Sequence, residues 1–403
     1  MDASRASARL LYGTQRSHRA AHIDNLMREH WGRAFLLVPT RHYAARRLES
    51  IILEGGLNGA WGRSVLTFDD FVEQLLKAEG HEPVRVDDTT RRLLLERALG
   101  ELKDTTALRE FSSVADTGGF VSHMLRVITQ LKQAAVEPHV FRERIQQRPH
   151  SSSIDAVVAD VYTAYQHALV EANVYDLPGL FWQAALECDG KRPAILKDIA
   201  VLILDGFDDF TPSEFHLLER LRPHLNLLVF GLNYDPNPDQ ADLFALTART
   251  AHNIAETFGA AVATFEEAPA ETQREFAASH IFWRDIPNAP AALTRDIDVL
   301  PCADHVQEIE TIGRRIKSLL LNGETSVEQV AVIYRNLRPV AGTLRAVFDE
   351  FGIPARILQP PALWESAVCS FILNLLEALS EWTHANVIDA IMSPWFPAEQ
   401  PHV

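Results

Sequence analysis

Cysteine is scarce in this sequence, and its spacing excludes several kinds of site. The chain has 3 cysteines among 403 residues, Cys188, Cys302 and Cys369, and no two of them stand in the CxxC spacing of zinc and iron–sulfur sites. Three thiols so far apart also do not make the dense disulfide framework of a small secreted domain. We therefore expect free, buried thiols in a reducing compartment, and no metal site.

Long apolar runs are missing as well. No stretch of the sequence approaches the roughly 18 uncharged apolar residues of a membrane-spanning helix. The first residues, MDASRASARL, also lack the apolar core of a secretory signal. We therefore expect a cytoplasmic protein that does not contact a membrane.

Positive charge is in deficit. Lys and Arg number 38 and Asp and Glu number 54, which gives a net charge of −16, whereas a free-standing nucleic-acid binder usually has a basic balance or a dense basic stripe. Only local basic clusters remain, at residues 41–47 and at Arg91-Arg92. Any DNA contact should therefore be a local groove or depend on a partner subunit, and we expect only weak DNA binding by the chain alone.

One stretch, residues 200–221, combines the strongest structural signals. Ala200–Leu204 is an unbroken apolar run, which is typical of a strand buried on both faces of a parallel sheet. Asp205 follows directly, at the strand end where open α/β sheets present ligands. Thr211 and Glu214 then predict a helix start with a capping box. An apolar strand that ends in Asp is how P-loop NTPases hold the magnesium of a nucleotide.

The start of the chain contains a degraded partner for such a site. Ala8–Tyr12 predicts a short strand, and GTQRSHRA follows it before a predicted helix. This is the context of a P-loop, but only Gly13 of the G-x-x-x-x-G-K-[ST] pattern is retained. His18 replaces the second glycine, Arg19 the phosphate-binding lysine and Ala20 the magnesium-binding hydroxyl residue. Taken alone, the segment is better explained as an ordinary strand-to-helix turn.

These patterns predict an α/β fold around a doubly wound parallel sheet. Further strands are expected at Ala34–Val38, Val65–Phe68, Asn226–Leu232 and Ala261–Phe265. Residues 86–189 have helical periodicity and no convincing strand, which predicts an all-helical insertion. We expect a first α/β domain from residues 1–85 and 190–290, and the start of a second at 291–403 with strands at 297–301, 329–334 and 355–358.

The order of these segments resembles a known family. Leu10–Ala20, Leu36–Ser50 and Leu66–Leu76 stand where superfamily 1 (UvrD-like) helicases have their P-loop and two DNA-side motifs. Ile203–Leu221 resembles the DGF-x-x-FTP-x-E signature in the N-terminal half of the B subunit of AddAB/RexAB-type helicase–nucleases, and it is the most specific match. Residues 304–357 resemble the opening of the second motor domain, with Arg335 at the position whose arginine reaches the nucleotide in active helicases.

The resemblance implies a P-loop NTPase-like (RecA-like) fold for both α/β domains. It also implies a degenerate nucleotide site, made of Gly13, His18, Arg19, Asp205, Asp208 and Arg335. An active member needs the P-loop lysine and an Asp-Glu pair, but Gly206 follows Asp205 here, and Asp208 or Asp209 is the only substitute at hand. Each loss typically removes orders of magnitude in rate. We therefore expect no catalytic residue, no cofactor and no ATPase activity; the family's C-terminal nuclease domain is expected to be absent from this chain.

The resemblance further implies candidate contacts to single-stranded DNA, at Thr40, Arg41, Arg47, Thr67 and Phe68. Each has a plainer explanation, because basic residues on an amphipathic helix are often just solvated and a Phe after a strand is often buried. For the nucleotide site the plainer explanations are also specific. Asp205 is expected to be structural, Arg19 to be either solvated or paired with Asp205, and Arg335 to pair with an acidic neighbour.

The expected function is a catalytically inactive, helicase-like module of a DNA helicase–nuclease complex. It would scaffold the complex beside an A-type helicase subunit and guide single-stranded DNA in double-strand-break repair or recombination. Two alternatives stay open. One is a divergent ATPase that uses Asp205, Asp208 or Asp209, Arg19 and bound ATP with magnesium; the other is a protein-interaction scaffold without DNA binding, which fits the charge of −16.

Overall fold

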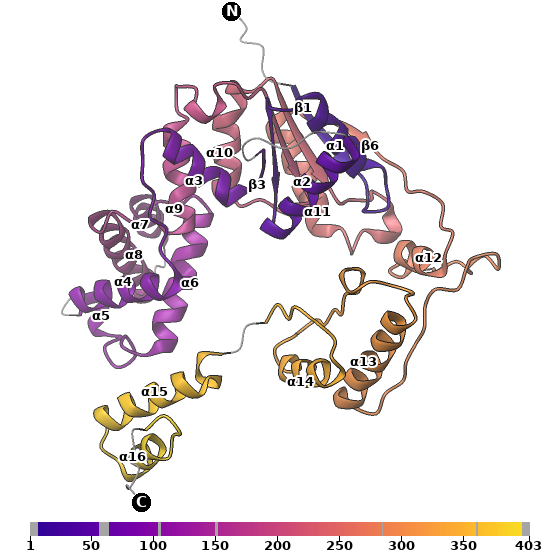
Figure 1. Ribbon diagram of the computed structural model, residues 1–403. Coiled ribbons are helices and arrows are strands. Elements are labelled where there is room, and N and C mark those ends of the chain that lie inside the picture. Colours follow the sequence, from indigo (N-terminus) through magenta and orange to yellow (C-terminus); the bar gives the residue numbers. More distant parts are fainter. Residues whose placement is uncertain are drawn as a thin grey trace, which may run out of the picture. The chain divides into compact units, whose positions relative to one another are not determined.

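The computed structural model describes residues 7–55, 64–103, 106–149, 152–283, 285–359 and 362–396. The chain divides into two compact units, Met1–Asp296 (unit 1) and Ile297–Val403 (unit 2). Unit 1 contains a six-stranded sheet, and unit 2 is built from helices within its described residues (Figure 1). No helix in the described ranges combines the length and the apolar character needed to cross a membrane.

The sheet of unit 1 is parallel throughout. Its strands are β1 (Ser7–Tyr12), β2 (Ala34–Val38), β3 (Val65–Thr67), β4 (Val201–Asp205), β5 (Leu227–Leu232) and β6 (Ala261–Thr264). They lie in the order β3-β2-β4-β5-β1-β6, so β4 and β5 are at the centre. Every residue of β2, β4 and β5 is buried, because a parallel sheet is covered on both faces.

Residues of the buried strands feed two separate cores, one on each face of the sheet. In β4, Leu202 and Leu204 belong to one core, whereas Val201 and Ile203 belong to the other. The first core is completed by helices α3 (Phe68–Ala78), α9 (Leu177–Glu187), α10 (Pro212–Leu221) and α11 (Ala245–Phe258), and the second by α1 (Arg19–Glu29) and α2 (Arg41–Gly55). Helices on both faces of a parallel sheet make an α/β fold, which confirms that part of the prediction.

The segment between β3 and β4 is helical. It contains α4 (Asp88–Glu101), α5 (Thr106–Arg109), α6 (Gly118–Gln133), α7 (Pro138–Gln146), α8 (Ser153–Glu171) and α9. Helices α4, α5, α6 and α8 supply most of the buried residues of a third apolar core, in which Tyr162 and Tyr165 are fully buried, whereas the buried residues of α9 belong to the first core. Helix α5 ends at Arg109, and the chain continues in turns in which the amide of residue i+3 donates to the carbonyl of residue i, as from Val114 to Phe111.

A buried ion pair fixes the start of α9 to α6. Lys132 Nζ lies 2.7 Å from Asp176 Oδ1, and the two side chains are 0% and 1% exposed. Asp176 also caps α9 by accepting a hydrogen bond from the Gly179 amide at 3.0 Å. Lys132 donates a second hydrogen bond to Gln166 Oε1 at 2.8 Å. Because a lone buried charge is costly, these partners explain how the core tolerates the pair.

A segment near the end of unit 1 follows the edge strand β6. Residues 265–283, which include helix α12 (Gln273–His280), run back over the carboxyl edge of the sheet and are called the strap below. Short 3₁₀ helices complete the elements of the chain, at Ala194–Leu196, Arg222–His224, Pro238–Gln240, Val327–Gln329 and Leu363–Glu365.

Unit 2 corrects the sequence-based prediction. Its helices are α13 (His305–Leu321), α14 (Ala341–Phe351), α15 (Ala367–Ser380) and α16 (His384–Ile391). The strands expected at 297–301, 329–334 and 355–358 are absent from its described residues. Val330, Val332 and Tyr334 do alternate inward onto the α13–α14 core, but an extended segment becomes a strand only when a partner strand accepts its hydrogen bonds.

Candidate functional site

The sheet topology brings three segments together at its carboxyl edge. Gly231 of β5 lies in register between Leu11 of β1 and Asp205 of β4. The loop after β1 therefore begins close to this row, at Gly13, and α1 starts at Arg19. Since the carboxyl ends of parallel strands are where α/β folds place their sites, this edge is the candidate site.

Asp205 is the centre of the site and is fully buried. Arg19 Nη1 donates to Asp205 Oδ1, and Arg47 Nη1 donates to Asp205 Oδ2. Arg19 also donates through Nε to the Gly13 carbonyl at 3.0 Å, which ties α1 to the loop. The two arginines are only 4% and 6% exposed, so both pairs are shielded from water. Both carboxylate oxygens of Asp205 are thus engaged by guanidinium groups.

A second carboxylate completes the arrangement. Asp24, on the inner face of α1, accepts from Arg47 Nε at 3.0 Å and from Nη2 at 2.5 Å. The hydroxyl of Tyr43 accepts from Arg47 Nη1 at 2.9 Å and lies 3.4 Å from Asp205 Oδ2. Arg19, Asp24, Arg47 and Asp205, called the ion cluster below, carry two positive and two negative charges and balance without any ligand.

Burial and charge act in opposite directions on the groups of the ion cluster. For Arg47, burial lowers the pKa, but Asp205 and Asp24 together raise the pKa above its usual value, so the guanidinium stays charged. For Asp24, burial raises the pKa of the carboxyl, and the opposing influence of Arg47 is the smaller of the two. The two carboxylates thus favour the positive charge of Arg47, whereas burial disfavours the negative charge of Asp24.

Two glycines make room for the ion cluster. A Cβ atom on Gly231 would lie 2.5 Å from Asp205 Oδ1 and 2.7 Å from Arg19 Nη1, so only glycine fits between them. Gly206 has φ = +83°, a conformation that side chains rarely adopt, and a Cβ there would lie 3.2 Å from Tyr43 Cε1. The backbone directly after Asp205 thus disfavours any residue with a side chain at position 206.

The DNA candidates separate into exposed and buried residues. Arg41 is exposed and pairs with Asp70 at 2.6 Å, and Thr40 accepts from the Tyr43 amide at 3.2 Å. Thr67 is buried and caps α3, and Phe68 is 3% exposed with its ring 5.0 Å from that of Phe181.

Arg47 is the clearest correction among these candidates, because its guanidinium belongs to the ion cluster rather than to a basic surface. Arg47, Thr67 and Phe68 are buried in this structure, whereas Thr40 and Arg41 are exposed. A DNA contact stays a prediction for all five residues.

The remaining predicted site residues lie outside the ion cluster. His18 is exposed at the N-cap of α1, without a side-chain capping bond, and Asp208 is exposed in the loop after β4. Arg335 is exposed in unit 2. Asp24, Tyr43 and Gly231 complete the site and were missed from the sequence.

Comparison with known proteins decides the family. The model of the family described as ADDB, N-terminal, matches residues 13–282, two thirds of the chain. The chain belongs to this family. The AddB match begins at the first residue of the loop after β1 and ends within the strap, so it contains the whole ion cluster.

Individual relatives share one description. Proteins named as the B subunit of an ATP-dependent helicase/deoxyribonuclease are similar over most of this chain. The protein from Desulforamulus reducens is 22% identical over 97% of the chain and 35% of its own length. The one from Clostridium tetani is 23% identical over 94% and 35%, and the one from Bacillus subtilis 24% identical over 77% and 28%. The chain thus spans about a third of the length of these AddB-type relatives.

Proposed function

We propose that this chain is a helicase-like part of a B-type subunit in a DNA helicase–nuclease complex, and that it does not turn over ATP. Its role would be to scaffold the complex beside an A-type subunit and to guide single-stranded DNA during double-strand-break repair or recombination. The relatives are named as subunits of an ATP-dependent helicase/deoxyribonuclease, and this name supports a place in a helicase–nuclease complex. The ion cluster is the observation that carries the proposed inactivity.

The chemistry of ATP hydrolysis needs groups that the ion cluster replaces. In P-loop (RecA-like) enzymes, an acidic residue at a strand end holds Mg²⁺ and a lysine reaches the phosphates. Here both oxygens of Asp205 already accept from Arg19 and Arg47, and Arg19 stands at the position of the lysine. A divergent ATPase would have to break the two buried ion pairs of Asp205 before this carboxylate could bind magnesium. The backbone conformation of Gly206 also disfavours a glutamate directly after Asp205.

The test of the proposed inactivity is a paired measurement on the purified 403-residue chain. Titration calorimetry with Mg-ATP should detect no saturable binding, and phosphate release should stay at background with and without single-stranded DNA. DNA-stimulated hydrolysis that Arg19→Ala abolishes would establish the divergent ATPase instead. The same chain, immobilised, should retain a subunit with an intact P-loop from an extract of its host.

A second candidate is a protein-interaction scaffold without DNA contact. The burial of Arg47 favours it, since one of the two candidate cations is withdrawn from the proposed DNA side, and Thr67 and Phe68 are buried as well. Anisotropy of a labelled single-stranded oligonucleotide distinguishes the two at several salt concentrations. DNA guidance predicts salt-sensitive binding that Arg41→Glu weakens and the control Arg97→Glu, an equal charge change on α4, does not. The absence of salt-sensitive binding by the unchanged chain favours the scaffold.

A further inference from the structure

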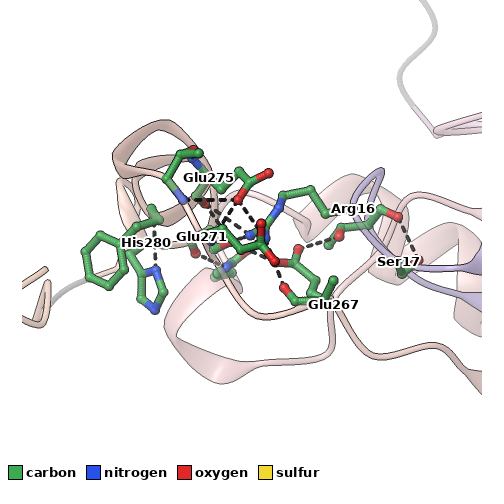
Figure 2. Close-up of polar contacts among 12 residues, drawn as sticks. Arg16, Ser17, Glu267, Glu271, Glu275 and His280 are labelled. Atoms are coloured by element: carbon green, nitrogen blue, oxygen red, sulfur yellow. Dashed lines mark hydrogen bonds and ion pairs between the residues drawn. The ribbon is translucent and has the colours of Figure 1, made fainter. Parts of the chain in front are cut away.

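The strap is joined to the loop between β1 and α1 by backbone pairing. β6 pairs with β1, and the Phe265 amide continues that pairing by donating to the Tyr12 carbonyl at 2.8 Å. Two residues later, Glu267 forms an isolated antiparallel bridge with Ser17. The strap thus crosses the loop at residues 14–17, and Figure 2 shows Glu267 between the loop, which carries Arg16 and Ser17, and the strap residues Glu275 and His280.

The Glu267 carboxylate collects three donors. Thr14 Oγ1 donates to Oε1, Arg16 Nη1 lies 3.3 Å from Oε2, and Ser279 Oγ donates to Oε2 at 2.7 Å. Two of these donors come from the loop and one from α12. A guanidinium and two hydroxyls converging on one carboxylate form a charge-assisted arrangement, which is stronger than neutral hydrogen bonds. Glu267 is therefore the point at which the loop and the strap are fastened together.

Arg16 strengthens the same fastening. Its guanidinium donates to the Ala268 carbonyl at 2.9 Å, to the Glu275 carbonyl at 3.1 Å and to Ser279 Oγ at 2.6 Å. Together with Glu267, these acceptors are four groups of the strap, although Arg16 itself belongs to the loop. A side chain that was only solvated would not be oriented by four groups of one segment.

The strap is also joined to the last residues of unit 1. The Gln273 amide donates to the Thr294 carbonyl at 2.9 Å, and the Thr294 amide donates to the Glu271 carbonyl at 3.1 Å. The Arg274 amide donates to Asp296 Oδ1 at 2.8 Å. Asp296 directly precedes unit 2 in sequence, so hydrogen bonds run without a break from the loop, through α12, to the residues at which unit 1 ends.

We infer that the strap is a built-in latch: its Glu267 carboxylate occupies the loop after β1 as an internal oxyanion and keeps that loop closed. A cavity of about 390 Å³ beside it is lined by Gly13, Thr14, Arg16, Tyr234 and Trp283. The loop that lost its P-loop side chains is thereby held by a group of the chain itself. The proposed latch is based on the contacts of Glu267 and Arg16, and it does not depend on whether the chain turns over ATP.

Hydrogen exchange of the full chain tests the latch. Glu267→Ala should speed amide exchange at residues 14–17 and throughout the strap, by about tenfold if one charge-assisted interaction is lost. Glu266→Ala removes an equal charge from the neighbouring position and should leave the exchange unchanged. Arg16→Ala should reproduce the Glu267→Ala pattern from the loop side. Unchanged exchange in both latch variants, or an equal effect of Glu266→Ala, would overturn the inference.

A second measurement asks whether the loop donors accept an external oxyanion. Inorganic phosphate, titrated by calorimetry, should bind Glu267→Ala at least about tenfold more tightly than the unchanged chain, because Thr14 and Arg16 are released. Adding Arg16→Ala should remove that gain. Phosphate affinity that is the same with and without Glu267, or a gain that survives the loss of Arg16, would contradict an internal oxyanion. Neither readout involves ATP turnover.

Discussion

The substitution Asp205→Asn separates a structural carboxylate from a magnesium ligand. It removes the negative charge that both Arg19 and Arg47 share, and leaves Asp24 as the only carboxylate of the ion cluster. Breaking a buried ion pair from one side costs about 3–5 kcal/mol, and asparagine retains one acceptor oxygen, which favours the lower figure. With roughly 2–4 °C per kcal/mol for a domain of this size, the melting temperature of unit 1 should fall by about 6–12 °C.

Thermal unfolding measures the melting temperature and urea unfolding the free energy, both followed by tryptophan fluorescence and far-ultraviolet circular dichroism, with and without magnesium. Asp208→Asn is the matched control, since Asp208 is exposed and its change should stay within about 0.5 kcal/mol. A buried carboxylate whose role is to bind magnesium is unfavourable when no metal neutralises its charge. Replacing such a carboxylate would leave the unfolding free energy of the metal-free chain unchanged or raise it. That result, or stabilisation of the unchanged chain by Mg-ATP that Asp205→Asn removes, would refute the structural role.

Three further outcomes follow from the same structure. Gly231→Ala should lower the unfolding free energy by about 1–3 kcal/mol, measured by urea unfolding, because its methyl group would crowd the ion cluster; an unchanged value would contradict the packing described. Lys132→Met should cost about 3–5 kcal/mol in the same assay, since Asp176 stays buried without its partner, and adding Asp176→Asn should recover part of that loss. Burial raises the pKa of the Cys188 thiol to about 12, so alkylation at about pH 8 should label Cys302 and Cys369 in the folded chain and Cys188 only after unfolding. Mass spectrometry identifies the labelled residues, and rapid labelling of Cys188 in the folded chain would contradict this.

The sheet could be predicted because its signal is local. A strand buried on both faces must be apolar at consecutive positions, and the bounds expected for Ala34–Val38 are those observed. The start of α10 was also predicted from local residues, as a capping box of Thr211 and Glu214. In the structure the Thr211 amide donates to Glu214 Oε2 at 2.6 Å, and the Glu214 amide donates to Thr211 Oγ1 at 3.3 Å. Both features depend on residues a few positions apart.

The strands expected in unit 2 show the limit of such signals. Val330 and Val332 alternate with exposed neighbours, as in a half-buried strand, and Ile333 beside them is 89% exposed. Alternation specifies which side chains face a core, but pairing needs a second segment in register, which alternation does not supply. The sequence therefore predicts an extended conformation here more securely than a strand.

Only part of the ion cluster was predicted from the sequence, although the sequence contains a further signal for two of its residues. Arg47 falls at helical spacing with Ala44, Leu48 and Ile51, on the buried face of α2, and Asp24 lies beside Ile23 on the buried face of α1. A charged residue in an apolar stripe requires a partner of opposite charge. That rule predicts that Arg47 and Asp24 turn inward, but which carboxylate meets which arginine depends on the strand order, which joins residues more than 150 positions apart.

The charge balance of the ion cluster bears on what the chain can do inside a larger assembly. A nucleotide changes the stability of a domain only by binding one state more tightly than another. Asp205 and Asp24 are paired with Arg19 and Arg47 from within the chain, so the charges of the ion cluster balance without a contribution from magnesium or phosphate. If the proposed inactivity holds, this unit keeps one shape while an active partner passes through its cycle of binding and hydrolysis, and that constancy is what a scaffold beside a motor needs.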